Sequence, residues 1–212
     1  ETITMTNETA ITTVDTSILA DFAGGTTGEV EMMIGIGLVK DSDAVFFQYL
    51  GEEQTPQALV YNTGKPLTRF ANVRLVGIDI AEEVGQFKST KLNLYLESTQ
   101  GRTIMLTSGL TTLWSQCVIT SLMGLEPVTQ MFTLDSWKGK EGLRPCFAAV
   151  RAGRQKVSDQ MMYDMLASAR KDRNDALKER LMREAVKSLK TALGGDVEEA
   201  QVTEVTDTEV PF

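Results

Sequence analysis

Short runs of β-type residues, most of them bounded by turn signals, fill the chain from residue 29 to residue 107. Six such runs cover residues 29–39, 44–50, 58–61, 72–80, 88–97 and 102–107. Turn-forming residues separate several of the runs, at 41–43, 62–66 and 100–101. Short strands at this spacing indicate a meander or a small barrel.

One helix is expected inside this β-rich region, over residues 108–123. Apolar residues recur there at helical spacing, and Gly124 follows as a stop signal. Trp114 lies on the apolar face of this helix and is expected in the core. Two further strands are expected at 128–134 and 144–150, joined by a basic connection that contains glycine.

This order of elements is compatible with a partly open Greek-key barrel of the OB type. A Whirly-like or other antiparallel α+β sheet would give much the same order. We therefore predict an α+β, β-rich fold: an antiparallel OB-like or related barrel or sheet with one inserted helix, followed by a long C-terminal helix.

The segment 158–193 contains no Gly or Pro, and its apolar residues keep a helical period. The segment begins with a Ser-Asp pair, which is an N-cap signal, and two glycines follow its last residue. An unbroken helix of this length would reach about 50 Å, but residues 170–174 lack an apolar anchor, so two helices are also possible. Residues 170–190 hold eight basic and four acidic side chains, which is typical of an amphipathic helix packed on the body or on a second subunit. A homo-oligomer is expected.

Composition divides the chain into four segments. They are an acidic, Thr-rich N-terminal arm with one short helix candidate (1–27), a β-rich domain (28–156), a C-terminal helical segment (157–194) and an acidic tail that we expect to be disordered (195–212).

The net charge of −8 is unevenly distributed along the chain. Residues 1–39 and residues 196–212 hold six acidic residues each and no Lys or Arg. Residues 40–195 hold the other 17 acidic residues and all 21 basic residues, so they carry a net charge of +4. Within that body, residues 86–156 hold nine basic and four acidic residues. This excess is compatible with binding to backbone phosphates, and also with an ordinary solvated surface.

The sequence has no His, which excludes His-based acid–base catalysis, Ser–His and Cys–His nucleophile pairs, and nearly every zinc or non-haem iron site. Two cysteines, Cys117 and Cys146, are too few for a disulfide framework and indicate a reducing compartment. Because no long apolar run occurs and no basic residue precedes an apolar stretch near the start, neither a membrane span nor a signal peptide is expected. The predicted location is the cytoplasm.

Motifs for phosphate or dinucleotide binding are incomplete. Gly35 and Gly37 match the first two glycines of a dinucleotide fingerprint, but Lys40 stands where the third belongs. Two glycines in a β-type run more often mark a bulge or close strand packing. We therefore predict no enzyme activity, no catalytic residue, no metal and no cofactor.

Strand alternation brings basic and aromatic side chains to one face in two places. In the fifth run, leucines point to the core and leave Lys91 and Tyr95 on the other face. In the last strand, Phe147 and Arg151 share the face opposite the core, while Trp137 lies beside two lysines in the basic connection. Each aromatic residue could instead be buried. Cations that follow a phosphate backbone and aromatic faces that stack on bases are what binding of a single strand requires. The candidate DNA-binding residues are Lys88, Lys91, Tyr95, Arg102, Trp137, Lys138, Lys140, Arg144, Phe147, Arg151 and Arg154.

The last residues of the sequence form an acidic segment that finishes in a hydrophobic residue, Pro and Phe. This segment resembles the tail of bacterial single-stranded-DNA-binding proteins. The resemblance is confined to the tip: Thr206 and Thr208 alternate with the last two acids, and no long linker rich in Gly, Gln or Pro precedes it. It implies that the terminal Phe and its carboxylate dock into a basic-rimmed pocket on replication, recombination and repair proteins. The partner-binding residues are then Asp207, Glu209, Val210, Pro211 and Phe212.

The expected function is therefore sequence-independent binding of single-stranded DNA, with recruitment of genome-maintenance proteins through the acidic tip. Two alternatives remain open: a phage-type structural or assembly protein, and a recombination accessory protein that anneals strands or loads another protein.

Overall fold

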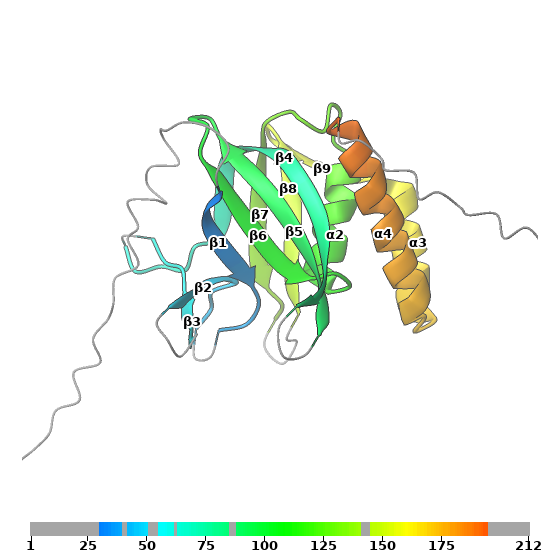
Figure 1. The fold of residues 1–212 in the computed structure, drawn as a ribbon, viewed down its shortest axis with the longest axis horizontal. Helices are drawn as coiled ribbons and strands as arrows, with labels where there is room; N and C mark the ends of the chain where they lie inside the picture. Colours follow the sequence, from blue (N-terminus) through cyan, green and yellow to red (C-terminus); the bar gives the residue numbers. More distant parts are fainter. Residues whose placement is uncertain are drawn as a thin grey trace, which may run out of the picture.

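The computed structural model describes residues 30–39, 42–50, 55–61, 63–84, 88–140 and 145–194. The described strands are β1 (Val30–Ile36), β2 (Phe46–Leu50), β3 (Thr55–Ala58), β4 (Arg69–Val84), β5 (Ser89–Ser98), β6 (Thr103–Gly109), β7 (Phe132–Lys138), β8 (Cys146–Ala152) and β9 (Gln155–Val157). The described helices are α2 (Leu113–Met123), α3 (Gln160–Lys171) and α4 (Asp175–Ala192). The helices lie together on one side of the sheet (Figure 1). The chain therefore has the α+β fold that the sequence predicts.

The strands form one open nine-stranded sheet in the order β3-β2-β1-β6-β5-β4-β7-β8-β9. The prediction of an antiparallel sheet is wrong at one place, because β1 pairs in parallel with β6. Alternation in the sequence reports which side chains are buried, but it does not report the direction of the neighbouring strand. Within the described residues the sheet does not close into a barrel, so the OB-type arrangement is not confirmed.

The sheet curls around its inner face, where the core lies. The rings of Phe46 on β2 and Phe70 on β4 meet edge to face with centroids 4.8 Å apart, although these strands are not neighbours in the sheet. A second contact also joins strands that are not neighbours: the Lys138 ammonium, at the end of β7, donates a hydrogen bond to the carbonyl of Ser42, just before β2. The curl lets alternate residues of many strands fill one core.

Helix α2 covers the inner face and packs against β8. Trp114 is buried, as predicted, and its indole N–H donates to the Ser136 hydroxyl at 2.9 Å. The helix starts after the N-cap Thr112 and ends at Gly124. A Cβ on Gly124 would lie 2.6 Å from the backbone carbon of Ser158, so this glycine allows the start of the next helix to approach closely.

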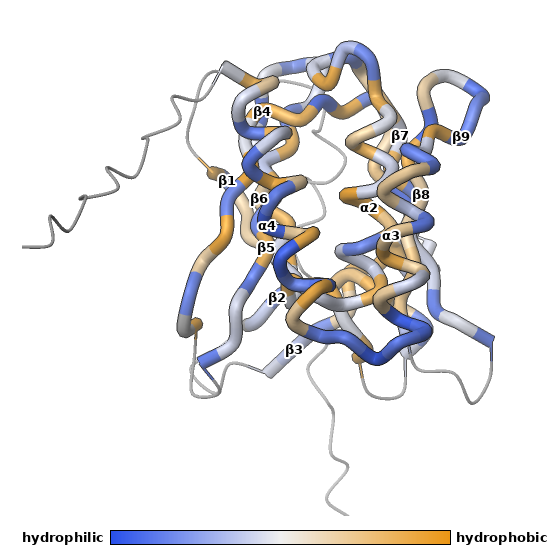
Figure 2. The backbone as a smooth tube through the Cα atoms, turned by 90° about the vertical axis from the view of Figure 1, so that its right-hand side faces the viewer, coloured by the Kyte–Doolittle hydropathy of each residue, from blue (hydrophilic) through white to orange (hydrophobic). Residues whose placement is uncertain are grey.

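Helices α3 and α4 lie side by side over α2, in front of the rest of the molecule in Figure 2. The prediction of one long C-terminal helix is wrong, because the structure has the two-helix alternative. Arg173 has a φ of +51°, which breaks the helical path, and the Asn174 side chain caps α4 by accepting from the N–H of Leu177 at 2.9 Å. The break falls in the stretch that lacks an apolar anchor. None of the described helices is long and apolar enough to cross a membrane.

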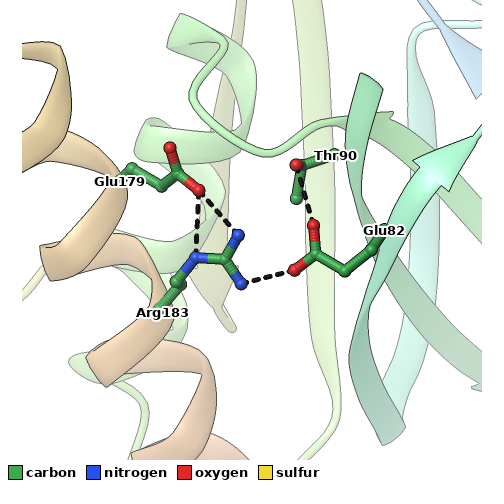
Figure 3. A network of polar contacts seen from close by, with 4 residues as sticks. All are labelled: Glu82, Thr90, Glu179 and Arg183. Atoms are coloured by element: carbon green, nitrogen blue, oxygen red, sulfur yellow. Dashed lines mark hydrogen bonds and ion pairs between the residues drawn. The ribbon is translucent and has the colours of Figure 1, made fainter. Parts of the chain in front are cut away.

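An ion-pair network ties α4 to the sheet (Figure 3). The Arg183 guanidinium donates to Glu82 of β4 at 2.5 Å and to Glu179 of its own helix at 2.6 Å. Thr90 of β5 donates to the second oxygen of Glu82 at 3.0 Å. These hydrogen bonds to the charged form lower the pKa of Glu82 and raise the pKa of Arg183. The network is exposed, so it fixes the position of α4 more than it adds stability.

The segment 135–142, expected to be a connection, begins as strand. Residues Asp135 to Lys138 complete β7. Burial still alternates along the strand, with Leu134 and Ser136 turned to the core. Because the buried residue is a Ser and the exposed residue is a Trp, the hydropathy of the sequence does not show this alternation. Strand β9 was not predicted, because its three residues are too short and too polar to give a signal.

Candidate nucleic-acid interface

We call the side of the sheet turned away from α2 the outer face. In β5 the side chains of Leu92, Leu94 and Leu96 fill the core, so Lys91 and Tyr95 lie on the outer face, as the alternation predicts. In β8 the same alternation places Phe147 and Arg151 on the outer face. These four predicted side chains, two on β5 and two on β8, therefore lie on the same face of one sheet.

The ring of Tyr95 lies against Gly77 of the neighbouring strand β4. A Cβ on Gly77 would be only 3.1 Å from the Tyr95 ring, so a larger residue would push the ring away. The Tyr95 hydroxyl donates to Asp79 at 2.9 Å, and the Asn93 amide donates to the other oxygen of that carboxylate at 2.8 Å. Burial and the nearby Asp79 carboxylate both raise the pKa of Tyr95, so the phenol stays protonated and the ring stays in place.

A second ring lies on glycine in the same way. A Cβ on Gly35 of β1 would be 2.4 Å from the ring of Phe47, and one on Gly37 would be 3.3 Å from it. The ring of Tyr49, which is 47% exposed, meets the edge of Phe47 with centroids 5.1 Å apart. Neither Phe47 nor Tyr49 is among the residues predicted from the sequence. The signal in the sequence is the glycine pair, which was interpreted as a mark of a bulge or of close strand packing; in the structure it accommodates the Phe47 ring.

Methionines connect these two aromatic positions across the sheet. The register places Met105 of β6 beside Tyr95, and Met33 of β1 beside Met105. Met33 is 51% exposed. Apolar and aromatic side chains therefore continue on the outer face from β5 to β1, where a base could contact a flat, soft surface.

A third aromatic group lies on β7 and β8. Trp137 and Phe147 are directly opposite each other in the strand register, with ring centroids 6.1 Å apart and ring planes at 14°. Trp137 is 43% exposed. Leaving a large indole this open costs hydrophobic free energy, which is why such residues are enriched where a partner covers them.

Two arginines meet at one carboxylate beside this pair. Arg69 of β4 donates through Nε to Asp135 Oδ1 at 2.6 Å, and Arg151 of β8 donates through Nε to Asp135 Oδ2 at 2.8 Å. Both guanidinium side chains are about half exposed, at 56% and 45%. Lys156 of β9 pairs with Arg151 in the register and is exposed. Arg69 was missed because it precedes the segment with the largest basic excess.

Four other predicted residues are less available or more distant in the fold. Arg102 is tied to Glu31 with an Nε–Oε2 distance of 2.5 Å. Lys138 is directed to the backbone of Ser42 and is only 25% exposed. Lys88 stands in the turn before β5 with a φ of +47°, and Arg154 is exposed in the turn between β8 and β9.

Lys140 is exposed just after β7. Arg144 lies outside the described residues, and so do the five residues assigned to partner binding: Asp207, Glu209, Val210, Pro211 and Phe212. The structure thus brings Trp137 and Phe147 together and places Arg151 on the same face further along β8, and it adds Arg69, Phe47 and Tyr49 to the outer face.

Two hollows lie away from these groups. One of about 350 Å³ lies between the loop after α2 and the end of α4, lined mainly by apolar residues such as Leu125 and Leu189. The other, of about 280 Å³, lies at the start of α2 beside Trp114 and Cys146. Burial raises the pKa of the Cys146 thiol, which makes it a weak nucleophile.

No protein-family model, curated protein or solved structure matches the chain. The chemistry of the outer face is therefore the basis on which its function is inferred.

Proposed function

We propose that this chain is a non-catalytic single-stranded-DNA-binding protein that holds the strand on the outer face of its sheet. The observation that carries the proposal is the stacked pair of exposed Trp137 and half-buried Phe147, which lies on the same face of the sheet as the half-exposed Arg69 and Arg151. Aromatic faces stack on any base and cations bind any phosphate, so this combination suits binding without regard to sequence. In OB folds, too, a face of a curled sheet binds the strand, and an OB-like mode of binding is part of the proposal.

Titration of the protein with fluorescein-labelled oligo-dT tests this proposal. We expect binding at low salt, with log affinity falling against log salt by about 0.7 per phosphate neutralised. Replacing Trp137 and Phe147 together by Ala should weaken binding by tenfold or more, because stacking is worth about 1–3 kcal/mol per base.

Tyr163 provides the matched control. It is an exposed aromatic residue on α3, on the helical side of the molecule, and it is 49% exposed. Tyr163→Ala should leave the affinity for oligo-dT unchanged. Absence of binding by the wild type at low salt, or equal losses in the two variants, would contradict the proposal.

Recruitment of genome-maintenance proteins is the second part of the proposal. It rests on the acidic segment that ends in Val210, Pro211 and Phe212. Deleting Pro211 and Phe212 should abolish pull-down of such partners and leave oligo-dT affinity unchanged. Survival of the pull-down would contradict this part alone.

Self-association remains a prediction, and a phage-type assembly protein is the alternative that it would support. Met161 and Met165 share one face of α3 and are exposed, at 70% and 37%. If this surface joins two copies, Met161→Lys should lower the molar mass measured by light scattering. Assembly combined with no affinity for oligo-dT would favour the structural role.

A further inference from the structure

We infer that Arg69, Asp135 and Arg151 form a clamp for one phosphodiester group, in which Asp135 is the positioning residue. This inference rests on the proposed function and names the part of the outer face that holds the strand's backbone. The three side chains come from β4, β7 and β8, three neighbouring strands of the sheet.

The two arginines supply more hydrogen-bond donors than Asp135 uses. A guanidinium has five N–H groups, and the contacts to Asp135 are made through Nε of each arginine. Among the described residues neither arginine has another hydrogen-bonding partner. Both side chains are about half exposed, so N–H groups that do not bond to Asp135 are available to donate to the two free oxygens of a phosphodiester.

The net charge of the three side chains also matches a phosphodiester. Two guanidinium groups and one carboxylate carry a net charge of +1, which matches the single negative charge of a phosphodiester. Without Asp135, the two arginines would repel each other and spread apart. With it, they are held before the strand arrives, so less side-chain entropy is lost on binding.

The clamp lies near the aromatic pair on the same face of the sheet. Trp137 follows Asp135 by two residues on the same strand and on the same face, about 7 Å away. Phe147 stands in the same relation to Ala149, the residue opposite Asp135. A phosphate in the clamp therefore places its neighbouring base beside the aromatic pair.

Asp135→Asn distinguishes this clamp from a simple structural ion pair. Removing a negative charge from a surface that binds DNA should strengthen binding if only overall charge matters. We expect the opposite: about tenfold weaker binding to oligo-dT, and a salt slope shallower by about 0.7. Arg151→Lys should weaken binding similarly although it keeps the charge, because a lysine lacks the fork.

Glu97→Gln is the matched control, because Glu97 pairs with Arg74 on the same face of the sheet. It removes the same charge and should leave the affinity unchanged or higher. If Asp135→Asn binds as tightly as the wild type or more tightly while Trp137 and Phe147 still matter, the clamp is wrong and the proposed function stands. If the wild type does not bind oligo-dT, both fail. Equal thermal unfolding midpoints for Asp135→Asn and the wild type would show that the loss does not come from unfolding.

Discussion

Two aromatic rings lie on the sheet because the residues beneath them have no Cβ. Phe47 covers Gly35, and Tyr95 covers Gly77. Glycine weakens a strand by itself, and a ring placed over it restores the lost contact and shields the backbone. The glycines and the rings therefore form pairs in which neither residue is favourable without the other.

This pairing predicts a coupling between two substitutions. Gly35→Ala places a methyl 2.4 Å from the Phe47 ring, so the ring must shift from its position on the strand, and the free energy of unfolding should fall by about 1–3 kcal/mol. In a Phe47→Ala background the same change should cost almost nothing, since the space is then empty. Urea denaturation of the four proteins measures both effects. Equal costs in the two backgrounds would show that the ring is not the obstacle.

The Glu82–Arg183 contact predicts a pH dependence. The folded-state pKa of Glu82 lies below its ordinary value of 4.5, so the contact stabilises the fold above that value and is lost as the pH falls through the lowered pKa. Glu82→Gln should therefore be less stable than the wild type near pH 7, by a small amount because the pair is exposed. The difference should disappear in acid. Thermal unfolding from pH 7 to pH 3 measures this trend, and a constant difference would refute the assignment.

At the scale of elements, the break between α3 and α4 carries its own test. Arg173 has a φ of +51°, a conformation that costs a non-glycine residue about 1 kcal/mol. Arg173→Gly should therefore raise the free energy of unfolding by up to this amount. Lys171→Gly, at the last position of α3, should lower it, because glycine is a poor helix former. Urea denaturation compares the two, and destabilisation by both would contradict the break.

The sequence predicts an element well where the evidence for it is local. Strand β5 and the faces of its side chains follow from strict alternation of Leu with polar residues. The end of β7 was predicted to be a connection because a serine there gives no hydrophobic signal. Ser136 is buried because its hydroxyl accepts a hydrogen bond from Trp114, which lies 22 residues away in the chain. The parallel partner of β1 was missed for the same kind of reason, since pairing direction is decided by the whole sheet.

The candidate site divides in the same way. Tyr95, Phe147 and Arg151 could be assigned to one face from their own strands. Arg69 could not, because its significance depends on Asp135, 66 residues away. Phe47 and Tyr49 belong to the run 44–50, which contains no Lys or Arg, so the sequence offers no reason to group them with cations. Only the fold places them on the outer face.

At the scale of the whole molecule, the distribution of charge predicts how the acidic segment 196–212 acts on binding. Its removal takes away six acidic residues and changes the net charge from −8 to −2. Affinity for oligo-dT should then rise by about threefold to tenfold at low salt. The gain should vanish near 1 M salt, where charges are screened beyond about 3 Å.

A variant with the same six residues changed to Asn or Gln provides the control. It should bind as the truncated protein does, because the effect comes from charge and not from chain length. Fluorescence titrations at two salt concentrations measure both proteins. Weaker binding after truncation would show that the segment contributes contacts to the strand.

The parallel pairing of β1 with β6 also determines the order in which the sheet can assemble. Strands β4, β5 and β6 follow one another closely in the chain and pair as neighbours, so they can form early. Strand β1 lies next to β6 with Ile34 opposite Leu106, about 70 residues apart. During synthesis on a ribosome, β1 precedes β6 and cannot form this pairing until β6 has been made. Among the described strands, β1 therefore completes its pairing late relative to its synthesis, and until then its apolar residues can associate with other chains.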